Sequence, residues 1–369
     1  MILNLFVTGM VVLWLSIFGY PLALALMRRR RAAASPDGAL PAVAVVVPTR
    51  NEEPLIAAKL DDLARSDYPS ERTTVLVVDG GSTDRTCAAV EDRSGVGLLR
   101  LPSSTGQADQ VFAALAVLPH EIVVVTDADA RLEPSCIREL VLEMMRDPQL
   151  GVAGALVRPE TTLLEERLYW WALTRLWWLE GEALSAAMVS GACYAVRTSA
   201  VRGGARASRA LDATLAAGAS AGGMAARLCP AARATEVRVP RSPREFVAFR
   251  RRRGAGYLHE ILRAGGAAAP LRWRVARAVR LWQMLVVPWI AAALAAAAAV
   301  LLGTPEWQWP LLAAAAFALP ALAVLTLTGP LEQRPPWWRL ALGAARAVAL
   351  TWLSLALLRA RPLVREQAA

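Results

Sequence analysis

The chain has 369 residues, a net charge of +10 and a hydrophobic share of 56%. This length is enough for one domain of ordinary size plus membrane segments, and the apolar share exceeds that of typical soluble proteins. Lys59 is the only lysine, so the basic excess is almost entirely arginine. We attribute that bias to a GC-rich genome and expect no nucleic-acid partner. The four cysteines, at positions 87, 136, 193 and 229, have no CxxC or CxxH spacing, which argues for reduced, buried thiols and against a zinc site or a disulfide framework.

The first predicted element is a membrane helix over residues 2–27. This stretch contains no charged residue and is followed by four arginines at 28–31. About 20 apolar residues suffice to cross a bilayer. A signal peptide has a shorter apolar run and carries its basic cluster in front of it. We therefore expect a spanning helix.

Residues 42–256 alternate between strand and helix patterns. The predicted strands are short, β-branched and continuously apolar, and lie at 43–47, 75–78, 97–101, 122–126 and 152–157. Helical patterns follow between them: one begins at Asn51 as N-cap with Pro54 in its first turn, a second begins at Ser82 or Asp84, and two more cover 107–118 and 134–145. Uninterrupted apolar strands are typical of a parallel sheet covered on both faces, so the pattern predicts an α/β sandwich.

Apolar stretches return near the C-terminus, at 281–302, 309–327 and 340–358. The first two are long enough to span a membrane, whereas the third contains Arg346 and is either a weaker spanning helix or one that lies in the interface. Arginines at 28–31 and within 272–280 flank two membrane helices on the side of the central region. By the positive-inside rule they place residues 32–280 in the cytoplasm of a multi-pass protein of a bacterial plasma membrane. The arginines at 359, 361 and 365 disagree if the last helix spans, so its topology stays open.

Polar residues follow three predicted strands at the point where each strand ends. Residues 47–52 read VPTRNE, residues 77–84 read VVDGGSTD and residues 126–129 read TDAD. The carboxyl ends of parallel strands line one crevice, where the ligands of open α/β sheets bind. Divalent cations such as Mg²⁺ prefer oxygen ligands, often one or two carboxylates together with substrate phosphates. Three acidic strand ends therefore predict a site for a divalent metal and a diphosphate.

These three motifs, in this order and each after a strand, resemble those of the family 2 glycosyltransferases in their membrane-embedded form. The family comprises nucleotide-sugar-dependent enzymes with the GT-A fold, and the resemblance covers about residues 42–256. It implies a mostly parallel sheet between helices, with transmembrane helices at both ends of the chain. The expected segments are an N-terminal transmembrane helix with its basic flank (1–31), a cytosolic GT-A domain (42–256), amphipathic basic interface helices (257–280) and a C-terminal membrane region with two or three transmembrane helices (281–369).

The resemblance assigns roles to the residues at the strand ends. Asp79 would contact the uracil and the ribose. Asp129 would ligate Mg²⁺ or Mn²⁺, and Asp127 would lie nearer the ribose or a metal-bound water. The metal would neutralise the diphosphate leaving group. The other substrate-binding residues expected at the first strand end are Pro48, Thr49, Arg50 and Glu52. On the residues alone, the aspartates are also consistent with capped turns, and the charges of the first loop with solvated side chains.

The catalytic base is marked less clearly. The family carries an acidic pair whose last aspartate takes the proton from the acceptor hydroxyl, and the best match here is Leu211-Asp212, with a single carboxylate. The resemblance makes Asp212 the candidate base of an inverting displacement. The alternative is an exposed helix residue in an alanine-rich stretch.

A run of arginines, FRRRRG at 249–254, occupies the place of the family's Gln-x-x-Arg-Trp element but has neither Gln nor Trp. In processive members that Trp helps to hold the growing polymer, so its absence implies transfer of a single sugar. We expect Arg250 and Arg252 to clamp the diphosphate or a lipid phosphate. The alternative is a patch attracted to anionic headgroups. Gln107 stands where many relatives have a lysine, which weakens the case for a positive contact there.

Together these features imply an inverting, membrane-bound hexosyltransferase. It would move one sugar from a nucleotide sugar, expected to be UDP-linked, to a lipid or lipid-linked acceptor at the cytoplasmic membrane face. Two alternatives stay open. A polyprenyl-phosphate glycosyltransferase needs no base because its phosphate acceptor is already ionised, which would explain the reduced acidic pair. A catalytically degenerate glycosyltransferase-like scaffold of the cell envelope is the other.

Overall fold

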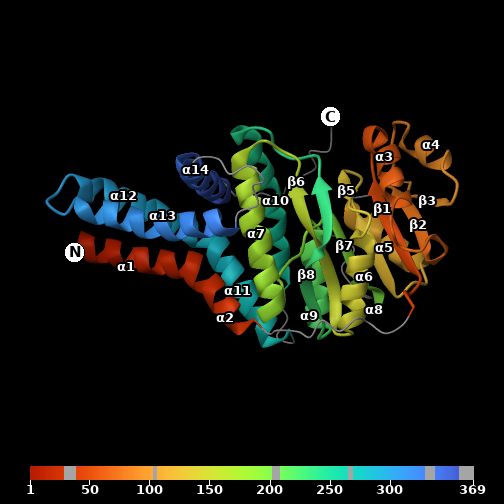
Figure 1. Cartoon of the computed structure of the whole chain (residues 1–369), viewed down its shortest axis with the longest axis horizontal. Helices are drawn as coiled ribbons and strands as arrows, with labels where there is room; N and C mark the ends of the chain where they lie inside the picture. Colours follow the sequence, from red (N-terminus) through yellow and green to blue (C-terminus); the bar gives the residue numbers. More distant parts are fainter. Residues whose placement is uncertain (29–38, 103–105, 202–207, 265–268, 329–336, 357–369) are drawn as a thin grey trace.

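The computed structural model describes residues 1–28, 39–102, 106–201, 208–264, 269–328 and 337–356. The strands within these ranges form one mixed sheet in the order β3-β2-β1-β4-β7-β6-β8-β5. Helices cover both faces of the sheet, and terminal helices extend away from it as an arm (Figure 1). The predicted α/β sandwich is confirmed.

The N-terminal half of the sheet is parallel and directs the predicted motifs to one edge. Its strands are β1 (Val43–Thr49), β2 (Thr73–Asp79), β3 (Val96–Arg100) and β4 (Ile122–Thr126). Mostly valine residues fill β1 and β4, and both strands are buried along their whole length. Thr49 pairs with Asp79 in the register of β1 and β2, so the first two motifs lie side by side.

The other half of the sheet brings a later segment against the third motif. Strand β7 (Cys193–Arg197) runs antiparallel between β4 and β6 (Leu150–Pro159), and β8 (Ala225–Glu236) pairs in parallel with β6. The short β5 (Ala130–Leu132) directly follows the aspartates at 127 and 129. It pairs with the end of β8, where Ala130 lies opposite Glu236. A third carboxylate therefore reaches the paired aspartates from far along the chain.

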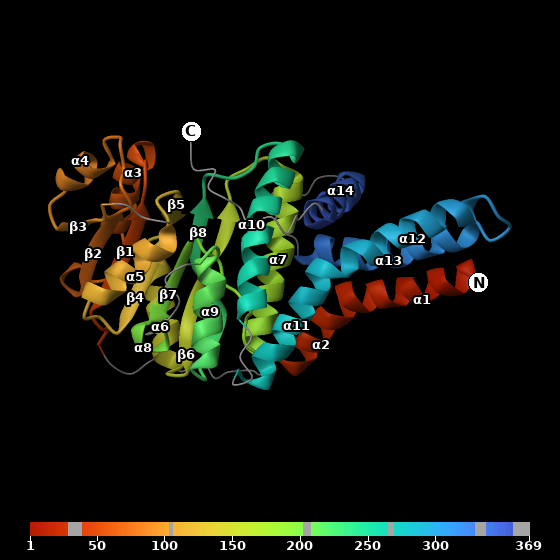
Figure 2. The same ribbon diagram turned by 180° about the vertical axis from the view of Figure 1, so that it is seen from behind.

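Two hydrophobic cores hold the helices on the sheet. One face packs against α3 (Glu53–Ala64), α4 (Thr86–Glu91), α6 (Cys136–Arg146) and α7 (Leu164–Ala183), and the other against α5 (Gln107–Val117), α8 (Thr198–Val201) and α9 (Leu211–Ala221). On α7, Trp170 and Trp177 meet edge to face, with 6.1 Å between ring centroids. Both views place α7 and α10 (Pro243–Arg263) between the sheet and the arm (Figure 2).

Helix α10 begins with a reciprocal capping motif. Ser242 is the N-cap, and its Oγ accepts a hydrogen bond from the amide of Glu245 at 3.3 Å. The Glu245 carboxylate accepts in return from the amide of Arg241 at 3.0 Å. Pro243 follows the cap, where its missing N–H costs nothing. This start fixes which faces of α10 turn toward the sheet and toward α7.

The loops after β1 and β2 are joined by hydrogen bonds, and the helix caps predicted after these strands are wrong. Helix α3 begins at Glu53, and Asn51 is not its N-cap; likewise Arg85 takes the N-cap position of α4. Asn51 has a φ of 57°, in the left-handed region that asparagine tolerates. Its Oδ1 accepts from the amide of Thr83 at 2.8 Å, and its own amide donates to Ser82 Oγ at 2.9 Å. Asn51 and Ser82 thus bond to the neighbouring loop because the two strand ends are adjacent. Asp84 accepts both from the amide of Thr86 at the start of α4, at 3.0 Å, and from the amide of Glu53 at 3.2 Å.

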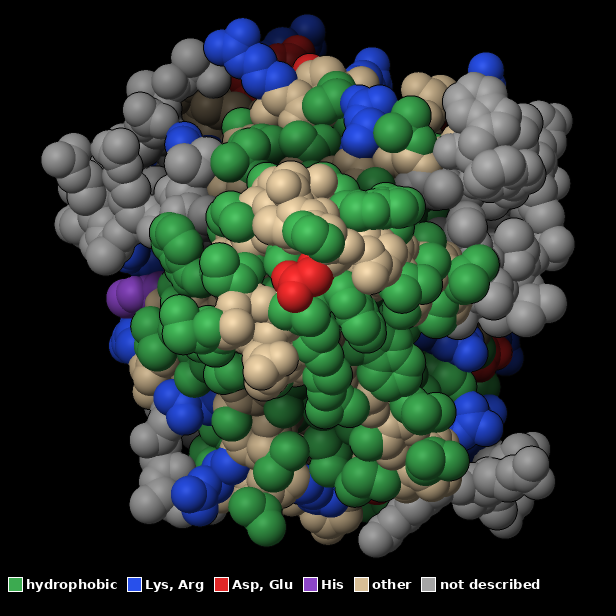
Figure 3. Space-filling model, turned by 90° about the vertical axis from the view of Figure 1, so that its left-hand side faces the viewer, with side chains coloured by type: hydrophobic (Ala, Val, Ile, Leu, Met, Phe, Trp, Pro, Cys, Tyr) green, Lys and Arg blue, Asp and Glu red, His purple; other side chains and the backbone are tan. Residues whose placement is uncertain are grey.

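The arm consists of helices from both ends of the chain. Helices α1 (Ile2–Trp14) and α2 (Tyr20–Met27) are joined by a π-helical turn, η1 (Leu15–Gly19), and they lie near α11 (Leu271–Leu285), α12 (Val287–Leu302) and α13 (Gln308–Thr328). By length and composition, Ile2–Met27 and Leu271–Leu302 could each cross a membrane, and Gln308–Pro320 is a shorter apolar helix. Seen from its free end, the arm presents a largely hydrophobic surface with basic side chains around it (Figure 3).

Helix α14 (Trp337–Ala356) packs on the domain. The Nε atom of Arg346 lies 2.9 Å from a carboxylate oxygen of Glu165 on α7, and Gly343 closely approaches Leu164. Helix α14 therefore contacts both α7 and α10 of the domain. The arginines at 359, 361 and 365 lie outside the described residues.

A buried ion pair joins the arm to the domain. Glu180 of α7 is fully buried, accepts a hydrogen bond from Tyr20 Oη at 2.9 Å and pairs with Arg280 at 3.1 Å. Tyr20 belongs to α2 and Arg280 to α11. One carboxylate therefore anchors both the N-terminal and the C-terminal helices against α7.

Candidate functional site

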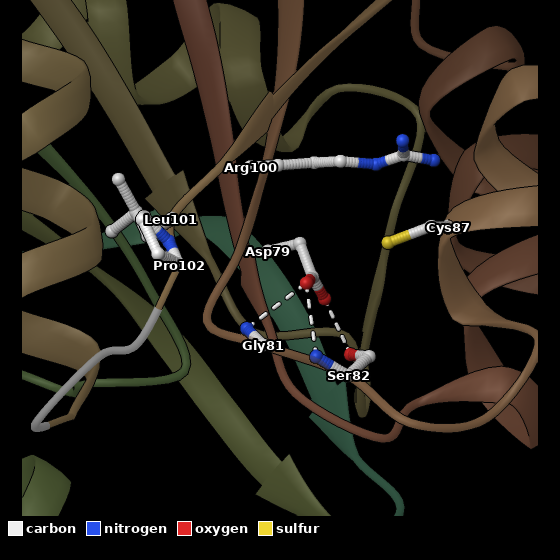
Figure 4. A pocket seen from close by; sticks show the side chains of 7 residues that line it. All are labelled: Asp79, Gly81, Ser82, Cys87, Arg100, Leu101 and Pro102. Atoms are coloured by element: carbon white, nitrogen blue, oxygen red, sulfur yellow. Dashed lines mark hydrogen bonds between the residues drawn. The ribbon is translucent and has the colours of Figure 1, made fainter.

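Asp79, the last residue of β2, faces a surface pocket of about 470 Å³ (Figure 4). Its carboxylate is buried and accepts hydrogen bonds from the amides of Gly81 at 3.0 Å and Ser82 at 2.9 Å, and from Ser82 Oγ. Gly81 has a φ of 87°, which a glycine adopts without strain. The pocket is lined by Asp79, Gly81, Ser82, Cys87, Arg100, Leu101 and Pro102. A fixed carboxylate beside a partly apolar hollow fits recognition of a base and a ribose.

The four cysteines are free thiols, and three of them are buried, as predicted from the sequence. Cys87 differs, since it is only half-buried and lines the Asp79 pocket.

The residues predicted at the first strand end have different surroundings. Pro48 and Thr49 are buried within β1, and the Thr49 carbonyl accepts from the Gly80 amide at 2.9 Å. Thr49 therefore fixes the loop between the two strand ends. Arg50 is exposed on that loop. Glu52 makes a two-pronged pair with Arg238, with N–O distances of 3.0 and 2.6 Å.

Asp127 and Asp129 lie in the tight turn between β4 and β5, and both are half-buried. The turn is fixed through its backbone: the Asp127 amide donates to the Ala192 carbonyl at 3.0 Å, and the Asp129 carbonyl accepts from the Val237 amide at 3.0 Å. The Gln107 side chain donates to Asp127 Oδ1. The contact that Gln107 makes with this turn is therefore that of a neutral amide.

The carboxylates of Asp127, Asp129 and Glu236 repel one another, and this repulsion and burial disfavour the ionised forms of the two aspartates. Burial raises the pKa of Asp127 above its usual range, and repulsion by Asp129 and Glu236 raises it further. Burial and Glu236 likewise raise the pKa of Asp129, whereas Arg238 and Arg253 oppose the shift. A divalent cation would relieve this repulsion, so the oxygen donors present fit Mg²⁺ or Mn²⁺. The described residues contain no cluster of three or more His, Cys, Asp or Glu side chains able to hold a metal, so a diphosphate would have to complete the coordination.

Asp212 is buried in the first turn of α9, which disagrees with an exposed helix residue. Its Oδ2 accepts from Tyr257 Oη at 2.9 Å and its Oδ1 from the Ala213 amide at 3.0 Å. Burial raises the pKa of Asp212 to about 6, although the hydrogen bond from Tyr257 opposes that rise. A Cβ added to Gly191 would lie 3.3 Å from Oδ2, so the carboxylate leans against the segment before β7. The next residue, Ala192, holds the Asp127 amide, so neighbouring residues contact both aspartates.

Arg250 and Arg252, the two arginines predicted to bind the diphosphate, do not lie together beside Asp127 and Asp129. Arg250 is buried, forms an ion pair with Glu166 of α7 and lies 3.7 Å above the ring centre of Tyr169. Arg252 is exposed beside Phe249, although partial desolvation of its guanidinium, together with the charges of Arg253 and Arg238, lowers its pKa. The structure therefore places Arg252 near the edge of the site and Arg250 in the packing between α10 and α7.

Arg253, which the sequence did not single out, lies beside the carboxylates together with Arg238, whose Nε is 3.9 Å from Asp129 Oδ2. Arg253 pairs with Glu236 at 2.6 Å, and its charge acts on Asp127, Asp129 and Asp212. Burial alone would lower the pKa of Arg253, but Glu236 and its other acidic neighbours raise it above the usual value. Glu236 is the last residue of its strand, as Asp79 is of β2, and that position is the signal by which the sequence could have indicated it.

A mixed sheet with a base-sized pocket at one parallel strand end, paired carboxylates at the next and a buried aspartate beside them defines a GT-A-type nucleotide-sugar enzyme. A family profile described as "Glycosyl transferase family 2" matches residues 44–198. A second, "Glycosyl transferase family group 2", matches residues 122–328, more than half of the chain. The chain belongs to the family 2 glycosyltransferases, as the motifs predicted.

Curated relatives share the region of the motifs. An N-acetylglucosaminyltransferase of Rhizobium meliloti (strain 1021) is 34% identical over 146 residues, which are 36% of this chain and 34% of that protein. A beta-monoglucosyldiacylglycerol synthase of Synechocystis sp. is 33% identical over 112 residues, or 27% and 22% of the two chains. The matches thus span only 34% and 22% of these relatives.

A solved structure extends the likeness in fold to nearly the whole chain. The mannosyltransferase PcManGT from Pyrobaculum calidifontis, in complex with GDP-Man and Mn²⁺, superposes with a TM-score of 0.73 and 24% identity. The alignment covers 96% of this chain and 99% of that one. The fold, including the helices outside the sheet, is therefore shared.

Proposed function

We propose that the protein is an inverting glycosyltransferase that moves one sugar from a UDP-linked donor to a lipid or lipid-linked acceptor at the cytoplasmic face of a bacterial plasma membrane. The observation that carries the proposal is the position of Asp212. It is buried, oriented by Tyr257 and joined to the Asp127 turn through Gly191 and Ala192. A buried carboxylate that contacts the segment holding the Asp127 turn is a candidate for the base that a direct displacement would need.

The donor half of the site divides into two parts. Asp79 would accept a hydrogen bond from the base or the ribose in its pocket, with Arg50 and Glu52 on the adjacent loop. Asp129 and Asp127 would hold Mg²⁺ or Mn²⁺, which supplies charge neutralisation for the departing diphosphate. The Mn²⁺ in the PcManGT complex supports a divalent ion, and the GDP-Man there keeps a guanine nucleotide among the donors to be tested.

The acceptor half rests on residues of α9 and α10. Asp212 would take the proton of the acceptor hydroxyl as that oxygen attacks the anomeric carbon. Its pKa of about 6 leaves it mostly ionised at neutral pH and still basic enough for this task. Tyr257 would keep the carboxylate oriented, and Arg253 would add positive charge beside the leaving group.

The arm supports a lipid acceptor and a membrane location. Its two long apolar helices would span the bilayer and keep the site close to the membrane surface. Arg28 lies 5.0 Å from the ring centre of Trp178 at the base of the arm; the arginines at 29–31 lie outside the described residues. The relative named beta-monoglucosyldiacylglycerol synthase is consistent with a lipid acceptor.

We further propose the segment boundaries 1–31, 42–256, 257–280 and 281–369 with one adjustment. Helix α10 runs without interruption from Pro243 to Arg263, so the catalytic domain would extend to its end. The C-terminal region would then contribute α12 and α13 to the membrane and α14 to the interface.

The test is release of nucleoside diphosphate by the detergent-purified chain, over a panel of nucleotide sugars, with Mn²⁺ or Mg²⁺ and bacterial lipid extract. Lipid-dependent release that is lost in Asp129→Ala would support the proposal, and the labelled lipid would identify the acceptor. Turnover that survives Asp212→Asn on a phosphate lipid would favour a polyprenyl-phosphate acceptor. Nucleotide binding without turnover on any donor would favour a degenerate scaffold.

A further inference from the structure

Lys59, the only lysine of the chain, is completely buried on α3 below the Asp127 turn. Its Nζ donates to Thr126 Oγ1 at 2.7 Å and to the Ala130 carbonyl at 2.8 Å. Thr126 is the last residue of β4 and Ala130 the first of β5. The ammonium group therefore bridges the two ends of the turn that carries both metal-binding candidates.

The same hydrogen bonds continue into the backbone that holds Asp127. Thr126 Oγ1 donates onward to the Ala192 carbonyl at 3.1 Å, and that carbonyl also accepts from the Asp127 amide at 3.0 Å. On the other side, the Ala130 amide donates to the Asp127 carbonyl at 3.2 Å. Loss of the Lys59 ammonium would leave both ends of the turn with one anchor fewer.

The lysine at position 59 is unusual for this chain, because every other Lys or Arg position is occupied by arginine. The chain has 41 basic residues of which 40 are arginine, so a lysine here goes against the composition. An ammonium is a compact group whose three donors point in different directions, whereas a guanidinium is a larger planar fork. The space between Thr126 Oγ1 and the Ala130 carbonyl is enclosed, and burying a cation there is costly without such partners. This geometry fits lysine and not arginine.

We propose that Lys59 is a positioning residue for the metal-binding turn. It holds Thr126 and Ala130 at a fixed separation, and its positive charge acts on Asp127 from within the fold. The inference rests on the proposed donor site, and it concerns how the turn is prepared for the metal. Groups that support metal ligands from behind in this way typically change metal affinity by about 10- to 100-fold when removed.

The experiment compares Lys59→Met with Arg227→Met in the full detergent-purified chain. Arg227 is also a fully buried cation, but its partners are Glu143 and Asp147, away from the turn. The first measurement is the Mn²⁺ concentration that gives half-maximal binding of UDP, or of the nucleoside diphosphate selected by the donor panel. We expect Lys59→Met to raise that concentration about 10-fold or more and Arg227→Met to leave it unchanged, although both lower the melting temperature.

Two further measurements test the inference even if Lys59→Met is too unstable for the nucleotide-binding measurement. Hydrogen exchange without metal should be faster at the Asp127 and Ala130 amides in Lys59→Met and unchanged there in Arg227→Met. Thr126→Val, which removes one acceptor and keeps the side-chain shape, should shift the Mn²⁺ requirement in the same direction by a smaller factor.

The outcomes separate the inference from the proposed function. Normal Mn²⁺ dependence and normal exchange of the turn in Lys59→Met would reduce Lys59 to a packing residue and overturn the inference, with the glycosyltransferase site intact. Failure of the unmodified chain to bind any nucleotide with Mn²⁺ would overturn the donor site itself. In that case, unchanged exchange in the variant would still count against Lys59 as the support of the turn.

Discussion

Tyr257 Oη donates a hydrogen bond to Asp212 Oδ2 at 2.9 Å, which joins the middle of α10 to the first turn of α9. Arg253 lies one turn earlier on α10 and pairs with Glu236 at the end of β8. A single helix thus supplies the hydroxyl group that donates a hydrogen bond to Asp212 and the guanidinium group that lies beside Glu236. This arrangement makes α10 the element that connects the two halves of the site.

Asp212→Asn should abolish transfer and leave donor binding intact, because the amide keeps the shape of the side chain but cannot accept the hydroxyl proton. We expect turnover to fall about 10²- to 10⁴-fold. Turnover and UDP affinity are to be measured on the same preparation. Near-normal turnover would remove Asp212 from the mechanism.

The pH dependence of kcat/KM should have an acidic limb near pH 6. The base works only when ionised, and burial raises the pKa of Asp212 to about 6, so activity should be lost as the pH falls through that value. In Tyr257→Phe the hydrogen bond that favours the ionised carboxylate is missing, and the limb should move to higher pH. A limb that stays in place in this variant would assign it to another group.

Removal of the divalent ion with EDTA, or the change Asp129→Ala, should eliminate nucleotide-dependent activity. The remaining carboxylates and arginines do not offer the diphosphate an equivalent charge. Titration of Mn²⁺ and Mg²⁺ into the stripped protein should restore activity only in the chain that retains Asp129. Full activity in EDTA would exclude the metal from the reaction.

Arg250→Gln should mainly lower the stability of the fold, whereas Arg253→Gln should mainly lower catalytic activity. Arg250 forms a buried pair with Glu166, so its loss should destabilise the fold by about 3–5 kcal/mol and leave the kcat of the folded fraction nearly unchanged. Arg253 faces the donor carboxylates, so its loss should lower kcat/KM on the folded protein. Thermal melting and kinetics on both variants distinguish the two, and the reverse pattern would restore Arg250 as the substrate clamp.

Reporter fusions at Ala34 and after the C-terminus should test the membrane arrangement. Ala34 lies outside the described residues, in the segment that follows the first helix, and its fusion should report a cytoplasmic position. A C-terminal fusion on the same side would fit α14 as an interface helix. An external signal at Ala34 would overturn the proposed topology.

The sequence by itself determined the alternation of strands and helices and the three motifs at the strand ends. Both are local properties: valine-rich runs predict buried strands, and Asp79, Asp127 and Asp129 follow such runs directly. Because parallel strands present their carboxyl ends at one edge, these motifs converge whatever the details of the loops. The family, the fold class and the position of these aspartates at the strand ends were predictable on that basis.

The tertiary structure decided which residues complete the site. Glu236 reaches Asp129 through the antiparallel pairing of β8 with β5, and Arg253 is selected over Arg250 by how α10 lies between the sheet and α7. The burial of Asp212 and the two contacts of Lys59 depend in the same way on packing between distant segments. Helical and strand periodicity specify only which face of one element is apolar, whereas these contacts arise from the pairing of elements far apart in the chain.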